Sequence, residues 1–397
     1  MELDPALNLP VDSAAATLVG RAWLAGPIPG RAVIALRGGE VHDITASAPT
    51  MSLLLEREDA VALARRAPGP PIASVADLLC NSSEEGRDPS RPFLLAPCDL
   101  QVLKASGVTF ASSLIERLIE EQARGDPARA EAVRARIVAI IGEDLRAIVP
   151  GSAAAMRLKA SLVEQRLWSQ YLEVGIGPDA EIFTKAPVLS AIGTGGDIGL
   201  HPASTWNNPE PEIVLAVNSR GHAVGATLGN DVNLRDFEGR SALLLGKAKD
   251  NNASCAIGPF LRLFDEHFGM DDVRAAEITV SVAGSDGFVL QGRSSMRQIS
   301  RDPLDLVAAA IGPAHQYPDG LMLFLGTMFA PIDDRDEKGA GFTHKLGDIV
   351  TIATPKLGRL VNRVGRSDQV APWTFGIGAL MANLAERRLI AQRDRAG

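Results

Sequence analysis

The chain has 397 residues, of which 46% are hydrophobic and 22% are charged, and its formal net charge at pH 7 is −8. This length permits two or three domains or one large core with an appendage, and the hydrophobic fraction is sufficient for a globular interior. The negative charge argues against a nucleic acid or an anionic membrane surface as a partner, and no apolar run approaches the ~20 residues of a membrane span.

The cysteines and the first residues of the chain favour a cytoplasmic protein. Cys80, Cys98 and Cys255 are odd in number and widely spaced, without a CxxC motif, so we expect packed, reduced thiols. The first residues are acidic and lack the basic and apolar regions of a secretory signal.

Short strands are predicted near the start of the chain. Residues 16–48 contain several short apolar runs, of which residues 32–36 and 40–44 are separated by Gly38-Gly39. Two adjacent glycines between apolar runs are typical of a β-hairpin. The sequence therefore predicts a hairpin in this region.

A change of composition marks a predicted domain boundary. Residues 64–94 are rich in Pro, Ser and charged side chains, which indicates a linker around one short helix at 74–79. We therefore expect a small N-terminal β-rich domain with its linker at residues 1–95. The larger domain is then expected at residues 96–397.

Three helices are predicted next, in a helical segment at residues 112–172. The first covers residues 112–124 and has apolar side chains at helical spacing. The second starts at an Asp-Pro pair, covers residues 126–148 and is stopped by Pro-Gly. The third covers residues 152–171 and has a broad apolar side.

Strand patterns dominate the rest of the chain. From Gly175 to about residue 365 the sequence alternates apolar runs with Gly and Pro turns, interrupted by a helix at 302–311. A final helix is predicted at 374–392, with arginines near its C-terminal end that suit the helix dipole. Strands and helices that are segregated in this way indicate an α+β fold.

Two glutamates precede an apolar, β-branched run. Glu210 and Glu212 are two positions apart, so both project from the same face of the predicted strand. The run ends near Arg220 and Gly221, and a second apolar stretch leads to Asp231. If these two residues form a two-residue hairpin loop, Asp231 lies opposite Glu210, where paired Cβ atoms are about 5 Å apart. Three carboxylates this close repel unless a cation lies between them, and an all-oxygen site suits Mg²⁺, Mn²⁺ or Ca²⁺ rather than zinc.

The same residues also fit a solvated strand edge. Pro removes a ladder donor, and charged side chains discourage pairing at an edge. The register is a further condition, because a three-residue loop would move Asp231 to the other face. The pattern alone therefore leaves a metal site and a solvated edge open.

A polar run at residues 246–259 contains a second candidate group. We expect a loop here, because the run lies between a strand pair and an apolar Ile-Gly-Pro segment. A lysine such as Lys249 becomes a base when a nearby divalent ion favours its neutral form. The alternative is a solvated lysine.

Other motifs are weak. The Gly-rich stretch at residues 193–197 resembles a phosphate loop only loosely, because it lacks the Lys-Ser/Thr pair and a following helix. We therefore predict an ordinary loop there. None of the six histidines has the spacing of zinc ligands.

Several short motifs nevertheless follow one another in a specific order. They are Glu-x-Glu before an apolar strand, Asn-Asp-Val-x-x-Arg-Asp, a Lys nine residues before Gly-Pro, then Gly326-Thr327 and Leu346-Gly347-Asp348. This ordered set resembles the fumarylacetoacetate hydrolase superfamily, over roughly residues 95–385. The resemblance implies a β-rich sandwich-roll core, a homodimer or homotetramer, and an Mg²⁺ or Mn²⁺ site.

The resemblance also assigns roles to individual residues. By position, the metal ligands of the superfamily correspond to Glu210, Glu212 and Asp231. Lys249 corresponds to its proton-handling lysine. Thr327, which follows Gly326, corresponds to the threonine that contacts the substrate carboxylate.

One position departs from the hydrolases of this superfamily. Those enzymes carry a His, and a Glu three residues later, which activate water on the substrate carbonyl. Here Ser113 stands at the position of the His, whereas Glu116 is retained. Serine cannot act as this base near neutral pH, which argues against hydrolysis of a C–C bond.

Other segments resemble a different branch of the superfamily. The Pro-Glu-Pro-Glu segment and the Tyr-Pro-Asp-Gly turn at 317–320 look like the sugar-acid dehydratases. More closely, residues 206–212 and 229–240 resemble bacterial 2-keto-3-deoxy-D-pentonate dehydratases. This resemblance implies a small-molecule substrate from the breakdown of D-xylonate or D-arabinonate.

The implied reaction is the loss of water from a 2-keto acid. A divalent ion would chelate the C1 carboxylate and the C2 ketone, Lys249 would remove a C3 proton, and Glu116 would protonate the departing C4 hydroxyl. The product would be 2,5-dioxopentanoate. Arg235 is a candidate partner for a substrate carboxylate, with a structural ion pair to Asp236 as the alternative. Acylpyruvate hydrolysis, 2-keto acid decarboxylation and non-catalytic binding of 2-keto acids remain the competing functions.

Overall fold

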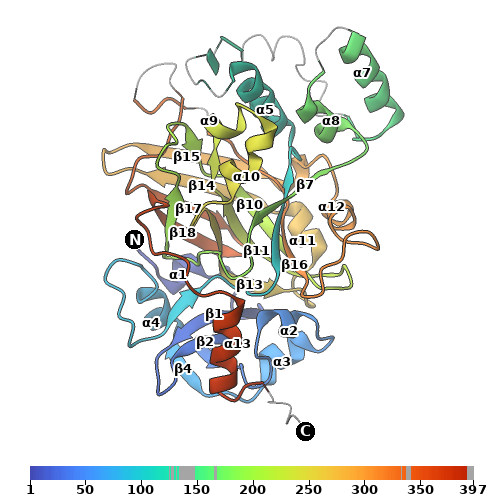
Figure 1. Cartoon of the computed structure of the whole chain (residues 1–397). Coiled ribbons are helices and arrows are strands. Elements are labelled where there is room, and N and C mark those ends of the chain that lie inside the picture. The colour runs from blue at the N-terminus through green and yellow to red at the C-terminus, as the bar shows by residue number, and fades with distance from the viewer. Residues whose placement is uncertain are drawn as a thin grey trace, which may run out of the picture.

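Two β-sheets form the centre of the molecule, and helices cover its two ends (Figure 1). The structure is a computed structural model that describes residues 1–124, 126, 129–130, 132–133, 148–164, 168–331, 333–336 and 341–390. Within these residues one sheet has eleven strands, another has five, and two short strands pair with each other. The α+β, β-rich architecture expected from the sequence is confirmed.

The large sheet is continuous from the N-terminal strands to the centre of the protein. Its order is β4-β3-β2-β1-β13-β11-β10-β16-β6-β7, with β5 paired to β1. The strands are β1 (Leu18–Leu24), β2 (Gly30–Arg37), β3 (Glu40–Asp43), β4 (Pro71–Ser74), β5 (Phe93–Leu95), β6 (Val102–Gly107), β7 (Glu181–Ala186), β10 (Pro211–Val217), β11 (Ala223–Asp231), β13 (Cys255–Leu263) and β16 (Leu321–Phe324). Strands on both sides of residue 95 thus share one sheet, and the domain boundary there stays a prediction.

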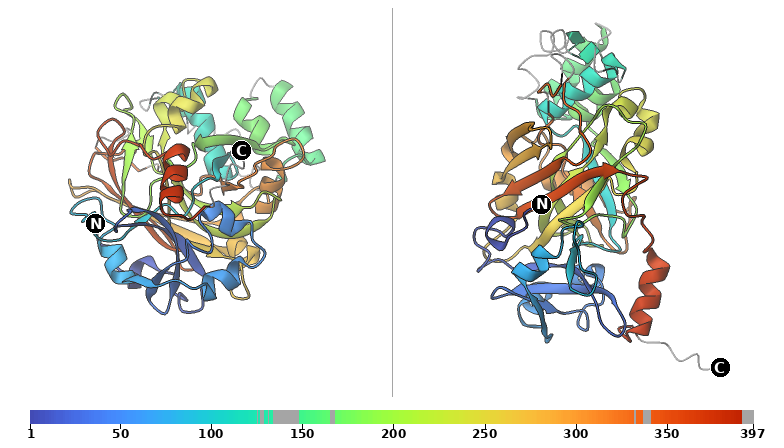
Figure 2. Two further views of the ribbon diagram at one scale, coloured as in Figure 1. Left: turned by 60° about the horizontal axis from the view of Figure 1, so that its bottom comes forward. Right: turned by 90° about the vertical axis from the view of Figure 1, so that its left-hand side faces the viewer.

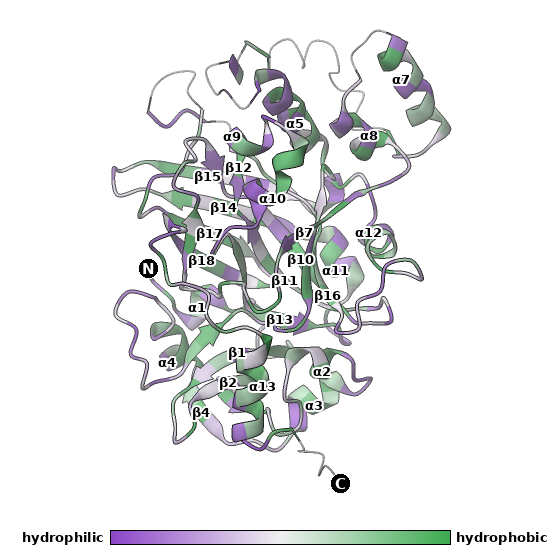
Figure 3. Ribbon diagram, viewed as in Figure 1, coloured by the Kyte–Doolittle hydropathy of each residue, from purple (hydrophilic) through white to green (hydrophobic). Residues whose placement is uncertain are grey.

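The second sheet packs against one face of the large sheet. It contains β8 (Asp197–Leu200), β14 (Glu277–Ala283), β15 (Val289–Ser295), β17 (Ile349–Thr354) and β18 (Gly358–Arg366). Buried and exposed residues alternate along β14, so one face of this sheet meets the core. Its buried side chains form a hydrophobic cluster with Ile213 and Leu215 of β10. The opposite face of β10 packs Val214 and Ala216 into another cluster, which explains its uninterrupted apolar run (Figure 3).

Most helices are short and lie outside the sheets. They are α1 (Pro5–Asn8), α2 (Met51–Leu55), α3 (Ala60–Arg66), α4 (Val75–Cys80), α5 (Ala111–Ala123), α7 (Ala153–Glu164), α8 (Gln170–Ile176), α9 (Arg235–Glu238), α10 (Leu245–Lys249), α11 (Met270–Ala275), α12 (Pro303–Ala310) and α13 (Ile377–Glu386). The paired short strands are β9 (Asn207–Asn208) and β12 (Asn233–Leu234). Helices α5, α7 and α8 lie at one end of the molecule, whereas α13 lies beside the N-terminal strands at the other end (Figure 2). Among the described residues, no helix is long and apolar enough to cross a membrane.

Several predicted elements are confirmed. The hairpin is formed by β2 and β3, whose residues Arg37 and Glu40 face each other across Gly38 and Gly39. Both glycines have positive φ angles, of 57° and 84°, which the two-residue turn requires. The helix predicted at 112–124 is α5, and the helix predicted at 302–311 is α12.

Other predicted elements differ. The single helix at 152–171 is wrong, because α7 ends at Glu164 and Ser169 caps a new helix, α8. The final helix starts at Ile377 rather than at residue 374, and its predicted end lies outside the described residues. The helix predicted at 126–148 also lies largely outside the described residues.

The predicted linker at residues 64–94 is only partly correct. The short helix α4 is present, and Ser74 caps it by accepting a hydrogen bond from the backbone N–H of Asp77. The same segment, however, supplies β4 and leads into β5, both of which join the large sheet. Strands of three or four residues show too few alternations to be detected by periodicity. Their partners, far away in the sequence, determine their conformation.

Candidate metal and active site

One edge of the large sheet brings together strand ends that are distant in the sequence. Strands β6 and β16 run parallel, so their C-terminal ends meet. Strands β10 and β7 run antiparallel to them and therefore begin at this edge, where β11 ends and β13 begins. Side chains placed just before or just after these ends converge on a single site.

The β10–β11 register places Asp231 as predicted, although the loop differs. The pairs Pro211–Asn230 and Glu212–Gly229 continue directly to Glu210 and Asp231, and the Asp231 N–H donates to the Glu210 carbonyl at 3.0 Å. The predicted two-residue loop is wrong, because three residues separate the hydrogen-bonded Asn218 and His222.

A β-bulge restores the expected register. Strand β11 contains one extra residue, Val224, opposite the step from Ala216 to Val217. The longer loop and the bulge offset each other, so Asp231 stays on the face of Glu210. The solvated strand edge is also excluded, because β10 is paired on both sides.

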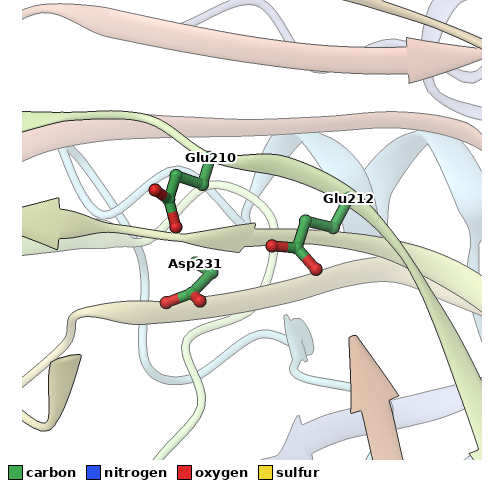
Figure 4. Close-up of side chains that lie close together, drawn as sticks. All are labelled: Glu210, Glu212 and Asp231. Carbon is green, nitrogen blue, oxygen red and sulfur yellow. The ribbon is translucent and has the colours of Figure 1, made fainter. Parts of the chain in front are cut away.

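The three carboxylates lie close together and are buried. One oxygen each of Glu210, Glu212 and Asp231 lies within 4.8 Å of the others (Figure 4). Their residues are only 3%, 1% and 1% exposed, respectively. Carboxylates at this distance and burial strongly repel one another unless positive charge compensates them.

Two lysines supply part of that positive charge. The Lys249 Nζ lies 2.5 Å from Glu210 Oε2 and 3.1 Å from Asp231 Oδ2. The Lys185 Nζ lies 2.9 Å from Asp231 Oδ1 on its other side. Burial opposes the charged form of Lys249, but Asp231 and Glu210 outweigh it and raise the pKa of the ammonium. The prediction that residue 249 lies in a loop is wrong, because this lysine ends α10.

Glu212 has no cationic partner among the described residues. Its oxygens accept a hydrogen bond from the Gly326 N–H at 2.6 Å and one from the Thr327 hydroxyl at 3.4 Å. Burial, reinforced by Asp231 and Glu210, raises the pKa of Glu212 well above its ordinary value. Gly326 has a φ of 107°, and a Cβ there would lie 1.8 Å from the Thr109 hydroxyl oxygen, so only glycine fits.

The charge balance of the whole site fits a divalent cation. Seven carboxyl groups surround this edge, namely Glu116, Glu120, Glu181, Glu210, Glu212, Asp231 and Glu238, against four cations, Arg117, Lys185, Arg235 and Lys249. The carboxylates therefore outnumber the cations when all are ionised. An all-oxygen donor set of this kind suits Mg²⁺ or Mn²⁺.

Arg117 is a site residue that sequence reasoning missed. Its guanidinium lies 2.7 Å from Glu210, Glu120 and Glu238, and the residue is only 8% exposed. Arg117 thereby holds the Glu210 carboxylate from the side opposite Lys249. The i, i+3 spacing on α5 accounts for the pair with Glu120, but no local signal indicates the partners supplied by β10 and α9.

Lys185 and Glu181 were also missed. Both lie on β7, which antiparallel pairing with β6 brings to the site. Burial, reinforced by Glu238, raises the pKa of Glu181 to about 7, although Arg117 opposes the shift. In the sequence these residues belong to an ordinary short strand, so only the sheet topology identifies them.

Ser113 and Glu116 lie on the first turns of α5. The Ser113 hydroxyl donates to the Phe110 carbonyl at 2.8 Å and accepts from the Phe110 N–H at 3.3 Å. It therefore caps its own helix. Glu116 is buried and its Oε2 lies 3.9 Å from the Arg235 guanidinium.

Arg235 is held by buried groups of the protein. Its Nε lies 3.2 Å from Glu120 Oε1 and donates to Asn208 Oδ1 at 2.9 Å. The alternative role, a structural ion pair with Asp236, is not formed: Asp236 accepts instead from the Thr205 N–H at 2.8 Å and from the Ser204 hydroxyl. Arg235 thus connects α9 to α5.

Asp348, from the Leu-Gly-Asp motif, anchors the segment that precedes β17. Arg335 contacts both of its carboxylate oxygens, at 2.5 and 2.7 Å, and His344 Nδ1 lies 3.2 Å away. Burial acts to raise the pKa of Asp348, but hydrogen bonds from Arg335 and His344 outweigh it and lower the pKa to about 2. The His344 N–H donates to Asn207 Oδ1 at 3.2 Å, which attaches this segment to β9.

Substitution of Asp348 with Asn is expected to lower the free energy of unfolding by about 2 kcal/mol at pH 7. The folded-state pKa is depressed, so the ionised carboxylate stabilises the fold above about pH 4. This contribution is lost as the pH falls toward the folded-state value of about 2. Urea unfolding of both proteins between pH 7 and pH 3 measures the effect. A stability difference that does not change with pH would contradict it.

Comparisons with known proteins agree with these features. A sequence profile described as "Fumarylacetoacetate (FAA) hydrolase C-terminal" matches residues 161–365. The 2-dehydro-3-deoxy-D-arabinonate dehydratase of Saccharolobus solfataricus is 28% identical over 190 residues, which are 48% of this chain and 60% of that protein. The probable 2-keto-3-deoxyxylonate dehydratase of Haloferax volcanii is 27% identical over 201 residues, which are 51% of this chain and 65% of that protein. The match thus spans less than two thirds of either relative.

Solved structures share the fold over a longer stretch. A 2-keto-3-deoxy-D-arabinonate dehydratase complexed with magnesium and 2,5-dioxopentanoate superposes with a TM-score of 0.61 at 21% identity, covering 88% of this chain and 99% of that chain. A fumarylacetoacetate hydrolase from Exiguobacterium antarcticum gives a TM-score of 0.52 at 15% identity, covering 88% of this chain and 100% of its own. The profile match covers about half of the sequence and contains the three carboxylates, Lys249 and Thr327. The chain belongs to the fumarylacetoacetate hydrolase family.

Proposed function

We propose that this protein is a metal-dependent dehydratase that converts 2-keto-3-deoxy-D-pentonate into 2,5-dioxopentanoate and water. Two relatives carry the names of dehydratases for such sugar acids. A protein of the same fold has been solved with magnesium and 2,5-dioxopentanoate. The buried carboxylates of this chain supply a matching donor set.

Glu210, Glu212 and Asp231 would hold the metal, as Mg²⁺ or Mn²⁺. The ion would supply Lewis-acid polarisation of the carboxylate and ketone of a 2-keto acid. The absence of an ion pair to Glu212 among the described residues supports this assignment, because the Gly326 N–H and the more distant Lys249 compensate its buried charge only in part. Thr327 and Gly326, which contact Glu212, would orient the substrate carboxylate next to these ligands.

Lys249 is the proposed base. In its neutral form the Nζ would accept the C3 proton of the substrate, and its place between Glu210 and Asp231 puts it beside the proposed ligands. The ammonium is favoured by the charge of these two carboxylates. Compensation of that charge by a cation therefore favours the neutral amine.

Glu116 is the proposed acid. It would give its proton to the C4 hydroxyl, which leaves as water while a double bond forms between C3 and C4 of the substrate. Transfer of a C5 proton to C3 then yields the enol of the C5 aldehyde, so the sum is loss of one water. Arg235 lies 3.9 Å from Glu116 and is proposed to fix its position rather than to carry the substrate.

The state of Ser113 supports dehydration over hydrolysis. At the position where hydrolases of the superfamily use a histidine, this hydroxyl is engaged by the backbone of Phe110 and caps α5. A serine at this position does not act as the base that activates water on a carbonyl.

The proposal also includes the expectations that the enzyme works in the cytoplasm and that it forms a homodimer or homotetramer.

A substrate panel tests the proposal. Purified protein with Mg²⁺ is expected to form 2,5-dioxopentanoate from 2-keto-3-deoxy-D-pentonates, to lose turnover on chelation and to regain it with Mg²⁺ or Mn²⁺. Acylpyruvates are expected to release no pyruvate. Pyruvate release at a matching rate would instead favour an acylpyruvate hydrolase. Release of carbon dioxide would favour a 2-keto acid decarboxylase. Metal-dependent binding of a 2-keto acid without any product would favour a binding protein. Full activity after exhaustive chelation would exclude the metal site.

A further inference from the structure

A cavity lies between the N-terminal strands and the loop before β8. Its volume is about 380 Å³. Three arginines line it, together with aromatic side chains, and we call it the arginine cavity: Arg21, Arg31, Arg87, Trp23, Phe93 and Trp373. The Gly-rich loop at residues 193–196 forms part of its wall. None of the three carboxylates of the proposed metal site lines it.

The sheet register explains why these side chains converge. Trp23 of β1 is paired with Arg31 of β2 on one side and with Phe93 of β5 on the other. Arg21 is two residues before Trp23, so it shares the same face of the sheet. Arg21 and Arg31 are thus diagonal neighbours on adjacent strands, and the charge of Arg21 opposes the charged form of Arg31.

Each of the three arginines has a buried nitrogen without a hydrogen-bond partner among the described residues. The residue Arg21 is 3% exposed, and its Nη1 donates to the Cys98 carbonyl at 2.5 Å, but its Nη2 has no acceptor. The Nε atoms of Arg31 and Arg87 also have none. A buried donor without an acceptor costs about 1–3 kcal/mol, and more when it is charged. These donors are therefore available to an acceptor that enters the cavity.

The charges of the cavity are also incompletely compensated. Arg87 pairs with Glu84 at 2.8 Å, and Arg21 lies 3.6 Å from Asp99. Arg31 makes no ion pair with a described residue, and its guanidinium stacks on Phe375, 3.7 Å from the ring centroid. Burial, reinforced by Arg21, lowers the pKa of Arg31 to about 9. The cavity thus presents excess positive charge.

We propose that the arginine cavity binds a small organic oxyanion, with a phosphate or carboxylate group held by Arg21 and Arg31. Guanidinium groups match the paired oxygens of both groups. A cavity of about 380 Å³ lies in the size range of small-molecule sites and exceeds what an inorganic ion needs. The Gly-rich loop lacks the lysine of a phosphate loop, but here arginines from β1 and β2 supply the charge. This site is independent of the proposed dehydratase reaction.

Ligand-dependent stability and tryptophan fluorescence test the proposal. Full-length protein, freed of metal by chelation, is titrated with glucose 6-phosphate and with succinate. Neutral glucose and sodium chloride at equal ionic strength are the references. Removal of the metal prevents the anions from binding through an ion at the three carboxylates. Trp23 and Trp373 lie in the cavity wall, so their fluorescence reports binding in the cavity directly. One of the two anions is expected to raise the Tm and change the fluorescence, and the one that acts identifies the phosphate or the carboxylate class.

Arg31→Met is the decisive variant and Arg57→Met its control. Arg57 is exposed and pairs with Asp59 away from the cavity, so the same change of charge leaves the site intact. Arg31→Met is expected to weaken anion binding at least tenfold, while the ligand-free Tm stays equal or rises because repulsion with Arg21 is removed. Arg31→Gln serves the same purpose if Arg31→Met does not fold. Absence of any response to both anions, or an unchanged response in the Arg31 variant, would overturn the proposal.

Discussion

Replacement of Glu212 with Gln is expected to weaken Mg²⁺ binding and to reduce turnover by orders of magnitude. The amide keeps the size of the side chain and can still accept from the Gly326 N–H, but it removes one of three charges that the ion would bind. Loss of an outer hydrogen-bond partner of a metal ligand costs about 10–100-fold in affinity, and loss of a ligand costs more. Calorimetric titration with Mn²⁺, and turnover at rising Mg²⁺ concentration, measure the two effects.

The stability of the Glu212→Gln protein separates a metal ligand from a structural group. Because the pKa of Glu212 is raised in the folded state, its ionised form destabilises the metal-free fold at neutral pH. The chelated variant is therefore expected to unfold at a higher temperature than the chelated wild type. Mg²⁺ at a hundredfold excess over Kd is expected to add about 2.7 kcal/mol to the free energy of unfolding of the wild type and so to raise its Tm. The same Mg²⁺ concentration is expected to have little effect on the Tm of the variant.

Glu56→Gln is the matched control for this experiment. Glu56 accepts hydrogen bonds from Ser219 at the opposite end of the same β10–β11 hairpin. The substitution removes the same charge without touching the three carboxylates. If the Glu56 variant loses metal affinity as strongly as the Glu212 variant, the loss reflects the hairpin, and the ligand assignment fails.

Replacement of Lys249 with Met is expected to lower turnover by more than roughly a hundredfold, the lower range for a positioned acid–base group. Binding of metal and of a substrate analogue is expected to remain nearly intact, because the carboxylates rather than the lysine hold the ion. Exchange of C3 protons with deuterated water, on a 2-keto acid that cannot eliminate, isolates the proton-abstraction step. Its rate is expected to fall with turnover.

Lys247→Met controls for the loss of a lysine from the same helix. Lys247 is exposed on α10, whereas Lys249 is buried at its end, so Lys247→Met removes a lysine from the same helix without removing the group that contacts Glu210 and Asp231. C3 exchange at the native rate in the Lys249 variant would show that another residue is the base. Glu116 would then be the next residue to replace.

The sequence by itself determined the local part of the site. The i, i+2 spacing put Glu210 and Glu212 on one face of a strand, and the apolar runs on both sides of a turn predicted the hairpin that leads to Asp231. The count that set Asp231 across from Glu210 assumed a loop one residue too short, and it held only because the bulge at Val224 offsets the longer loop. Alternation along a strand is a local property, because successive side chains point to opposite faces. Helix caps such as Ser74 and the Gly38-Gly39 turn are local as well.

Tertiary structure decided which residues surround those carboxylates. Arg117 from α5 and Lys185 from β7 reach the site only because parallel β6 and β16 align their ends beside β10. Tertiary pairing also decided the three-residue loop and the bulge at Val224, which offset each other only once β11 is fixed between β10 and β13. Contacts between residues far apart in sequence depend on the packing of the whole sheet, and no local periodicity encodes that packing.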